Sequence, residues 1–190
     1  RRAVEQRKAD EERRRKDALP EFEITERQSV SQIALRPPGT HVFLLVADRS
    51  EAKPTIVPNY VTESGYTEDI PSRPKVGDAQ GRQRLAVLNP ETRKSVWADA
   101  SFAGTAKVQG KDEPRELRWS APTISPDGRL VVATARSDDF MDRWIVALDP
   151  ESGKTRVIDA LHDDAWIREA GGGPFGGGGL GWMPDGRSLW

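Results

Sequence analysis

The sequence contains no cysteine, which excludes disulfide bonds, thiolate nucleophiles and cysteine-based zinc sites. Its two histidines, His41 and His162, are too few for a histidine-rich metal site, and we expect neither a metal nor a cofactor. No apolar run reaches the length of about 18 residues that indicates a membrane-spanning helix. The 29 basic and 30 acidic residues leave a net charge of −1, which excludes a globally basic protein that binds nucleic acid.

Glycine and proline, by contrast, are more frequent than average. The 190 residues include 17 glycines and 14 prolines, a combined share of about 16 % against a norm of about 12 %. Both residue types favour turns. The excess therefore indicates a chain with many turns and favours a β-rich fold over a helix bundle.

Residues 1–18 form a charged unit that lacks glycine and proline, so its helix propensity is high. Oppositely charged pairs such as Asp10 and Arg14 lie four residues apart, a spacing that supports an exposed helix. No apolar stripe is present for docking, so we expect a solvated helix ending at Pro20. The alternative is a basic arm that contacts nucleic acid or lipid headgroups, but the interleaved acidic residues cancel its field. We therefore divide the chain into a helical unit at 1–20 and a β-domain at 21–190.

Two sequence motifs recur with nearly the same period. Residues 124–132 (ISPDGRLVV) match residues 182–190 (WMPDGRSLW), and residues 84–92 (RLAVLNPET) match residues 144–152 (WIVALDPES). The motifs have the composition of turns between strands, since proline presets φ and glycine accepts a positive φ. Two different motifs at offsets of 58 and 60 residues predict a repeat architecture.

One repeat is predicted to contain four short strands. The complete copy has strands at about 117–124, 129–136, 143–148 and 154–159. The copy before it has strands at about 29–35, 41–47, 84–88 and 94–98, with an insertion at about 49–82, and a third copy begins at about 180. Several strands are apolar on both faces, as they are in the packed blades of a β-propeller.

The predicted fold class is therefore all-β: a partial β-propeller of about two and a half four-stranded blades, preceded by a short charged helix. Propellers typically have 4–8 blades. Because three blades do not close a ring, we expect this chain to be a segment of a larger protein.

The densest polar cluster in the sequence is the run from His162 to Glu169. Adjacent ligand-type residues do not converge on one metal ion from a single strand or helix, so we expect no metal site. Two interpretations remain open: a connection between blades, or a loop that presents Trp166, Arg168 and Glu169 to a ligand. A carboxylate suits a ligand ammonium group, and arginine suits a carboxylate. The glycine-rich stretch at 171–181 is a candidate for lining a cavity.

The insertion at 49–82 is longer than a simple hairpin loop, and loops of this length are usually functional or disordered. Its aromatic residues and Ile70 indicate ordered packing against a neighbour. The candidate contact residues are Tyr60, Glu63, Tyr66 and Arg73.

Several of these motifs resemble one known family. The S-P-D-G-R turn, the N/D-P-E-T/S turn, the run His162-Asp-Asp-Ala-Trp166 and the following segment 181–190 resemble the N-terminal propeller of dipeptidyl peptidase IV-type serine peptidases in the prolyl oligopeptidase family. The insertion segment from Tyr60 to Asp69 resembles bacterial members. The resemblance covers about residues 24–190.

This resemblance implies a propeller that restricts the access of short peptides to a C-terminal α/β-hydrolase domain of the same chain. That domain would carry the Ser-Asp-His triad, so no catalytic residue is assigned in this segment. In dipeptidyl peptidases of the family, a pair of propeller glutamates binds the substrate ammonium group. The consecutive-glutamate motif is absent here, and Glu169 after Arg168 occupies the comparable place. The candidate substrate-binding residues are thus Glu169, Arg168 and Trp166.

Some alternatives stay open at this point. Dipeptidyl, oligopeptidase and acylaminoacyl specificities are all compatible with the motifs, as are a monomer and a homodimer. The resemblance favours a periplasmic or secreted protein, although a cysteine-free chain also fits the cytoplasm. Because TolB-like propellers share the S-P-D-G turn, the competing function is a non-enzymatic propeller that mediates protein–protein interaction.

Overall fold

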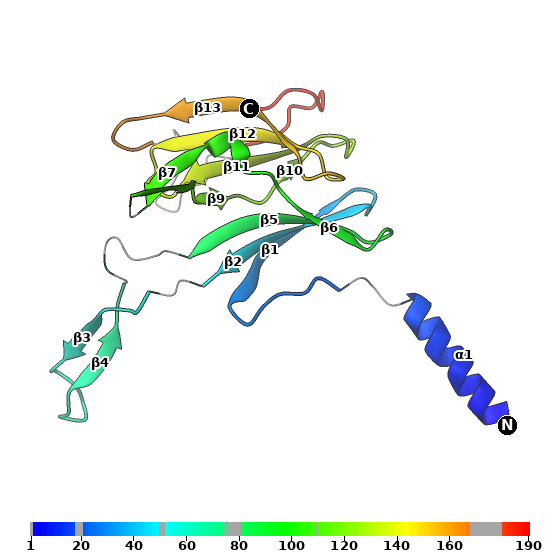
Figure 1. The fold of residues 1–190 in the computed structure, drawn as a ribbon, viewed down its shortest axis with the longest axis horizontal. Helices are drawn as coiled ribbons and strands as arrows, with labels where there is room; N and C mark the ends of the chain where they lie inside the picture. Colours follow the sequence, from blue (N-terminus) through cyan, green and yellow to red (C-terminus); the bar gives the residue numbers. More distant parts are fainter. Residues whose placement is uncertain are drawn as a thin grey trace.

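The computed structural model describes residues 2–17, 21–49, 52–73, 75, 81–108, 110–167 and 180–190. The helix α1 (Arg2–Asp17) stands apart from the sheets, as Figure 1 shows. Its described side chains are exposed, as expected for a helix without an apolar stripe. The predicted charged helix is confirmed.

Two antiparallel sheets make up most of the rest of the described chain. The first has the strand order β1-β2-β5-β6, with β1 (Gln28–Arg36), β2 (His41–Asp48), β5 (Arg82–Asn89) and β6 (Lys94–Trp97). The second has the order β10-β11-β12-β13, with β10 (Thr123–Ile124), β11 (Val131–Ser137), β12 (Asp142–Leu148) and β13 (Thr155–His162). The first sheet contains the four strands predicted for its repeat. The second contains five, because one predicted strand is divided in two, so the blade assignment is confirmed.

The predicted strand at 117–124 is divided in two. A short strand β9 (Leu117–Trp119) and β10 both pair with β11, and Pro122, which has no backbone N–H, lies between them. Ser120 bridges the gap, since its N–H donates to the Thr134 carbonyl and its hydroxyl accepts from the Thr134 N–H. The first strand of the blade is therefore interrupted but stays attached.

The turn motifs have the conformations that their residues favour. In the S-P-D-G turn, the Gly128 N–H donates to the Ser125 carbonyl at 2.8 Å, and Gly128 has a φ of +72°. The Ser125 hydroxyl donates to Asp127 at 2.6 Å. In the third copy, Asp185 accepts hydrogen bonds from the Arg187 and Ser188 N–H groups. These turns connect successive strands of each blade.

The main hydrophobic core lies between the two sheets, which are stacked face to face in Figure 1. Phe43, Leu45, Leu85 and Val87 of the first sheet face Trp119, Val131, Trp144 and Val146 of the second. Phe102 makes edge-to-face contacts with Trp119 and Trp144, at centroid distances of 5.9 and 5.5 Å. Face-to-face packing of successive antiparallel sheets is the blade arrangement of a propeller.

Polar contacts also join the two blades. The Arg36 side chain of β1 donates to the Gly128 carbonyl at 2.6 Å. His41, only 2 % exposed, lies 3.0 Å from a Glu151 oxygen. His41 is therefore a structural residue at the contact between the blades.

The opposite face of the first blade has a smaller core of Leu44, Val46 and Ala86. Phe22, from the segment before β1, packs on this face and makes an edge-to-face contact with Trp97 at 5.9 Å. Both faces of the first blade thus carry apolar residues, as its sequence indicates.

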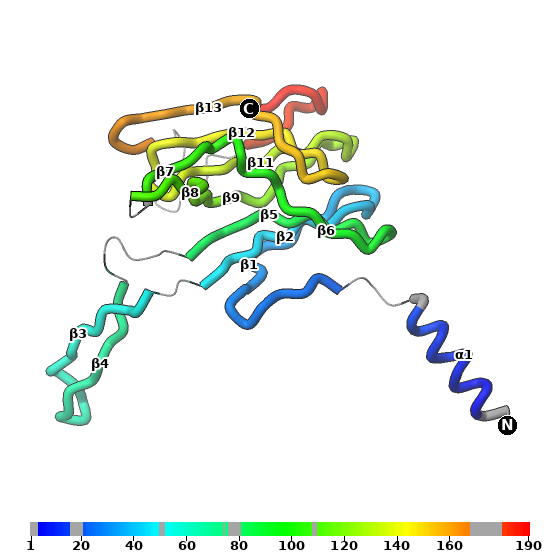
Figure 2. The backbone as a smooth tube through the Cα atoms, viewed as in Figure 1, coloured from blue at the N-terminus to red at the C-terminus, as the bar shows by residue number. Residues whose placement is uncertain are grey.

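Three smaller units complete the described chain, as the tube in Figure 2 allows the reader to follow. The insertion contains a hairpin of β3 (Ile56–Asn59) and β4 (Glu68–Pro71). A 3₁₀ turn, η1 (Ser101–Ala103), and a second hairpin of β7 (Thr105–Val108) and β8 (Lys111–Pro114) connect the blades. The third repeat begins with an antiparallel bridge between Trp182 and Leu189. The fold is a partial β-propeller of about two and a half blades preceded by a helix.

No helix in the part of the chain that the structure describes is long and apolar enough to cross a membrane.

Candidate functional site

The polar cluster predicted from the sequence begins at the end of β13 and continues into a connector at 163–167. This connector lies against the loop between β11 and β12. The Asp163 N–H donates to the Met141 carbonyl at 2.9 Å, and the Ile167 N–H donates to the Phe140 carbonyl at 2.8 Å. Two backbone hydrogen bonds thus fix the connector beside this loop.

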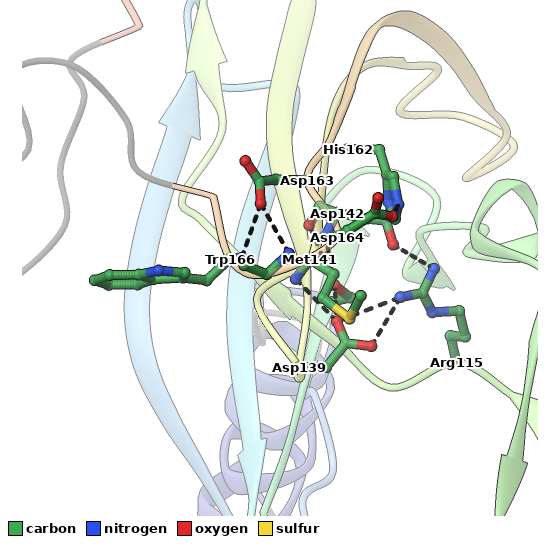
Figure 3. A network of polar contacts seen from close by, with 10 residues as sticks. Arg115, Asp139, Met141, Asp142, His162, Asp163, Asp164 and Trp166 are labelled. Carbon is green, nitrogen blue, oxygen red and sulfur yellow. Dashed lines mark hydrogen bonds and ion pairs between the residues drawn. The ribbon is translucent and has the colours of Figure 1, made fainter.

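Within the connector, Asp163 organises a turn that presents Trp166. Its carboxylate accepts hydrogen bonds from the Ala165 and Trp166 N–H groups, at 2.8 and 3.1 Å. These two bonds lower the pKa of Asp163 below its ordinary value. The Trp166 side chain is 67 % exposed, and its ring extends away from the neighbouring polar network (Figure 3). The ring is therefore available for contact with another molecule.

A chain of ionic contacts connects Arg115 with the end of β13 (Figure 3). Arg115 lies 3.0 Å from Asp139 and 2.6 Å from Asp142. The Ser137 hydroxyl, buried at the end of β11, donates to Asp139 at 2.5 Å. Asp142 in turn lies 2.7 Å from His162 Nδ1. These contacts link the segment before β9, the β11–β12 loop, the start of β12 and the end of β13.

His162 lies between two carboxylates. Its Nδ1 contacts Asp142 at 2.7 Å and its Nε2 contacts Asp164 at 3.1 Å. A neutral imidazole has one N–H, whereas the imidazolium has two and donates to both carboxylates. The hydrogen bond with Asp142, and then that with Asp164, raise the pKa of His162 above its ordinary value. The geometry thus favours the protonated side chain.

This pairing predicts a pH dependence of stability. Because the folded-state pKa is raised, the stabilising contribution is fully present below the ordinary value near 6.5. It is lost as the pH rises through the higher folded-state pKa. We expect Asp164→Asn to lower the pKa of His162, as measured by NMR titration of the ring, with His162→Gln identifying its signal.

Asp112→Asn on β8 is the matched control, because Asp112 is exposed and does not contribute to the His162 shift. An Asp164→Asn variant with an unchanged His162 titration would contradict the assigned contact.

A cavity of about 520 Å³ lies next to this network, where the two sheets meet. This volume falls within the range of about 300–1,000 Å³ that is usual for small-molecule sites. Its polar lining includes Gln32 and Gln83 from the first blade and Arg118 and Arg136 from the second. Phe140 also lines the cavity, and its carbonyl binds the Ile167 N–H. The predicted connector therefore borders the cavity through Phe140.

Arg118 is held in place at the cavity wall. It forms an ion pair with Asp138 at 2.7 Å and lies over the Phe140 ring at 5.8 Å from its centroid. The wall thus combines a fixed cation with two aromatic side chains, Trp119 and Phe140. Such a lining is suited to polar ligands with an apolar part, including peptides.

The structure places only part of the predicted site. Trp166 is exposed on the connector, next in sequence to Ile167. Arg168, Glu169 and residues 171–179 lie outside the described residues. Leu180, from the predicted glycine-rich stretch, lines the cavity, and its carbonyl accepts a hydrogen bond from the Thr123 hydroxyl at 3.4 Å. The candidate contacts Tyr60, Glu63, Tyr66 and Arg73 are exposed on or next to the β3–β4 hairpin.

Sequence reasoning missed the polar cavity residues Gln32, Gln83, Arg118 and Arg136. All four occupy positions inside strands. One sequence signal could have identified them. Each is a polar residue within a strand whose apolar residues belong to the core. Within the described ranges, no group of three or more His, Asp or Glu side chains is arranged to hold a metal ion.

Two sheets stacked as blades, with the strand order of a meander, define the chain as part of a β-propeller. No protein-family model and no curated protein sequence matches the chain. Solved structures do match it. A protein from Bacteroides ovatus ATCC 8483 assigned as a dipeptidyl aminopeptidase IV has a TM-score of 0.54 and 14 % identity, with 77 % of this chain covered. Dipeptidyl peptidase 4 from Porphyromonas gingivalis has a TM-score of 0.52 and 12 % identity, with 70 % covered.

The chain spans only 21 % and 18 % of the lengths of these two proteins. At such low identity, the shared property is the fold. The fold of this chain is therefore that of a segment of dipeptidyl peptidase IV structures, in agreement with the resemblance found in the sequence.

Proposed function

We propose that this chain is the propeller portion of a serine peptidase that cleaves short peptides. Catalysis would take place in an α/β-hydrolase domain of the same protein. The observation that carries this proposal is the fold shared with segments of two dipeptidyl peptidase structures over 70–77 % of the chain. The sequence motifs that resemble this family support it independently.

In this proposal the propeller controls the access of peptides to the hydrolase domain. The cavity where the blades meet and the exposed Trp166 of the connector are suitable for contacting a peptide. An exposed indole offers a large apolar surface to a side chain or a peptide bond. Glu169 would bind the substrate ammonium group, and Arg168 a carboxylate.

The test uses the full-length protein. We expect a fluorophosphonate probe to label one serine and to abolish the hydrolysis of short peptides. We also expect Glu169→Gln to raise KM for peptides with a free N-terminus, because the variant lacks the charge that pairs with the ammonium group. The control substrate is the same peptide with an acetylated N-terminus, for which KM should not change.

A folded full-length protein that is neither labelled nor active would contradict the peptidase and favour the non-enzymatic propeller. Normal labelling together with an unchanged KM in Glu169→Gln would keep the peptidase and remove Glu169 from the substrate site.

A further inference from the structure

The cavity where the two blades meet is lined by cations and by hydrogen-bonding side chains. Arg118 and Arg136 are its charged residues, and no aspartate or glutamate of the described part of the chain lines it. Gln32 and Gln83 add amide groups on the side of the first blade. A cleft whose charges have one sign concentrates a potential that attracts the opposite sign. The lining therefore favours an anionic group of a ligand.

An irregularity in β1 brings two successive residues to the wall of this cavity. On a regular strand, neighbouring side chains point to opposite faces of the sheet. The β1–β2 register shifts between Val30 and Gln32, and both Ser31 and Gln32 line the cavity. Bulges are frequent next to functional sites, where they redirect a side chain. The first blade thus departs from regular pairing where it borders the cavity.

The second blade is also irregular at this cavity. The break between β9 and β10 supplies several of the lining residues, which are Trp119, Ser120, Ala121 and Thr123. The Ser120 hydroxyl accepts a hydrogen bond from the Thr134 N–H at 3.1 Å. Because a hydroxyl both accepts and donates, the Ser120 hydroxyl can donate its own proton to a ligand.

Arg118 combines a fixed position with a donor group that the described residues do not use. Its Nε donates to Asp138 Oδ1 at 2.7 Å, and its Nη2 lies 2.7 Å from the same oxygen. A guanidinium group has five N–H donors. In the part of the chain that the structure describes, Nη1 has no hydrogen-bond acceptor. Asp138 therefore holds the side chain in place and leaves N–H groups for a further acceptor.

From this lining we propose that the cavity binds a carboxylate group of a short peptide through Arg118 and the Ser120 hydroxyl. An ionised carboxylate only accepts hydrogen bonds, and its bond with a guanidinium group is strengthened by the two charges. The carboxylate is either the C-terminus of the peptide or the side chain of an aspartate or glutamate. Trp119 and Phe140, which also line the cavity, would contact the apolar part of the peptide. The choice of a peptide as the ligand rests on the proposed function.

The test measures binding to the full-length protein, in which the serine labelled by the fluorophosphonate is replaced by alanine so that no probe is hydrolysed. If no serine is labelled, the wild type is used. One probe is a peptide of four alanines with a free C-terminus, and the second is its C-terminal amide. The third is the same amide with glutamate in place of the third alanine. Ligand-observed NMR titrations give the dissociation constants.

We expect at least one of the two carboxylate probes to bind about tenfold or more tightly than the plain amide, because a hydrogen bond between charged groups is worth roughly 1.4 kcal/mol or more. Tighter binding of the free acid identifies the C-terminus as the source of the carboxylate. Tighter binding of the glutamate probe identifies a side chain. Equal binding of all three probes, or no binding, would overturn the proposal.

Substitution of Arg118 tests the assigned partner. Arg118→Gln should remove the preference for the carboxylate, and Arg118→Lys, which keeps the charge, should retain part of it. Arg129→Gln is the matched control, because Arg129 is exposed, also lies near an aspartate, at 3.8 Å from Asp127, and does not line the cavity. This control should bind like the wild type. An equal loss for all three probes in Arg118→Gln would mean that Arg118 supports the fold and does not bind the carboxylate.

Arg168 is the competing residue, since the sequence predicts that it binds a carboxylate. Loss of the preference in Arg168→Gln, together with its retention in Arg118→Gln, would overturn the assignment to the cavity. The peptidase proposal fails separately, through the absence of labelling and hydrolysis. A labelled, active protein without a carboxylate preference would overturn only the cavity site. A carboxylate preference in a protein that is neither labelled nor active would overturn only the peptidase.

Discussion

Replacement of Gly153 by alanine is expected to destabilise the protein by roughly 2–5 kcal/mol. Gly153 has a φ of +72°, and this left-handed conformation costs an L-residue roughly 1–2 kcal/mol. A Cβ at this position would also collide with the Trp97 carbonyl of the first blade. Displacing a packed backbone adds about 1–3 kcal/mol. The free energy of unfolding from chemical denaturation of the full-length protein measures this loss.

The physical reason is that Gly153 lies at the contact between the blades. Its carbonyl accepts a hydrogen bond from the Asp99 N–H at 2.8 Å, and the Thr155 hydroxyl donates to the Asp99 carbonyl at 2.9 Å. Backbone from two blades therefore approaches closely at the site of the missing side chain. Any added atom must separate strands that hydrogen bonds hold together.

Gly65→Ala is the matched control for this substitution. Gly65 has the same φ of +72°, but a Cβ there would meet no atom within 4 Å. Only the conformational cost of roughly 1–2 kcal/mol applies to it. Equal losses of unfolding free energy in Gly153→Ala and Gly65→Ala would show that the close approach of the blades at Gly153 does not contribute to the destabilisation.

Trp119→Ala is expected to cost about 3–5 kcal/mol, the range for removing a large aromatic side chain from a core. Trp119 is 5 % exposed and belongs to the cluster between the two blades. Its loss also removes the edge-to-face contact with Phe102. The midpoint and free energy of urea unfolding of the full-length protein measure the effect.

Trp166→Ala serves as the comparison, because it makes the same substitution at a side chain that is 67 % exposed. Exposed substitutions usually change stability by no more than about 0.5 kcal/mol. A stability loss similar to that of Trp119→Ala would mean that Trp166 belongs to a core, and it would count against a role in ligand contact.

Much of the blade architecture could be predicted because the turns are encoded locally. The Pro126-Asp127-Gly128 and Asp149-Pro150 motifs specify turns within a few residues, and apolar runs specify the strands beside them. The β7–β8 hairpin could not be found this way. The strand β8, Lys111–Pro114, is exposed throughout, so it lacks the alternation of apolar and polar residues that indicates a half-buried strand.

The candidate site was predictable only in part. The run from His162 to Trp166 was visible as a polar cluster. Its partner Asp142 lies 20 residues before His162, and Arg115, which pairs with Asp142, lies 47 residues before it. Nothing in the local sequence indicates these contacts. They arise because antiparallel pairing of β12 with β13 places Asp142 opposite His162. Pairings between strands, and the cavity that they create, require the tertiary structure.

The position of the β3–β4 hairpin, an arm inserted into the first blade, has a consequence for how such a protein can diversify. The arm is inserted between β2 and β5, yet these strands pair continuously from Val42 opposite Leu88 to Asp48 opposite Arg82. The entropy of closing a chain loop grows only logarithmically, at about 0.6 kcal/mol for each doubling of length. Evolution can therefore lengthen, shorten or replace the arm with little effect on the blade that carries it. The pairing that builds the blade and the surface that the hairpin exposes are thus encoded in separate segments, and selection can act on either one alone.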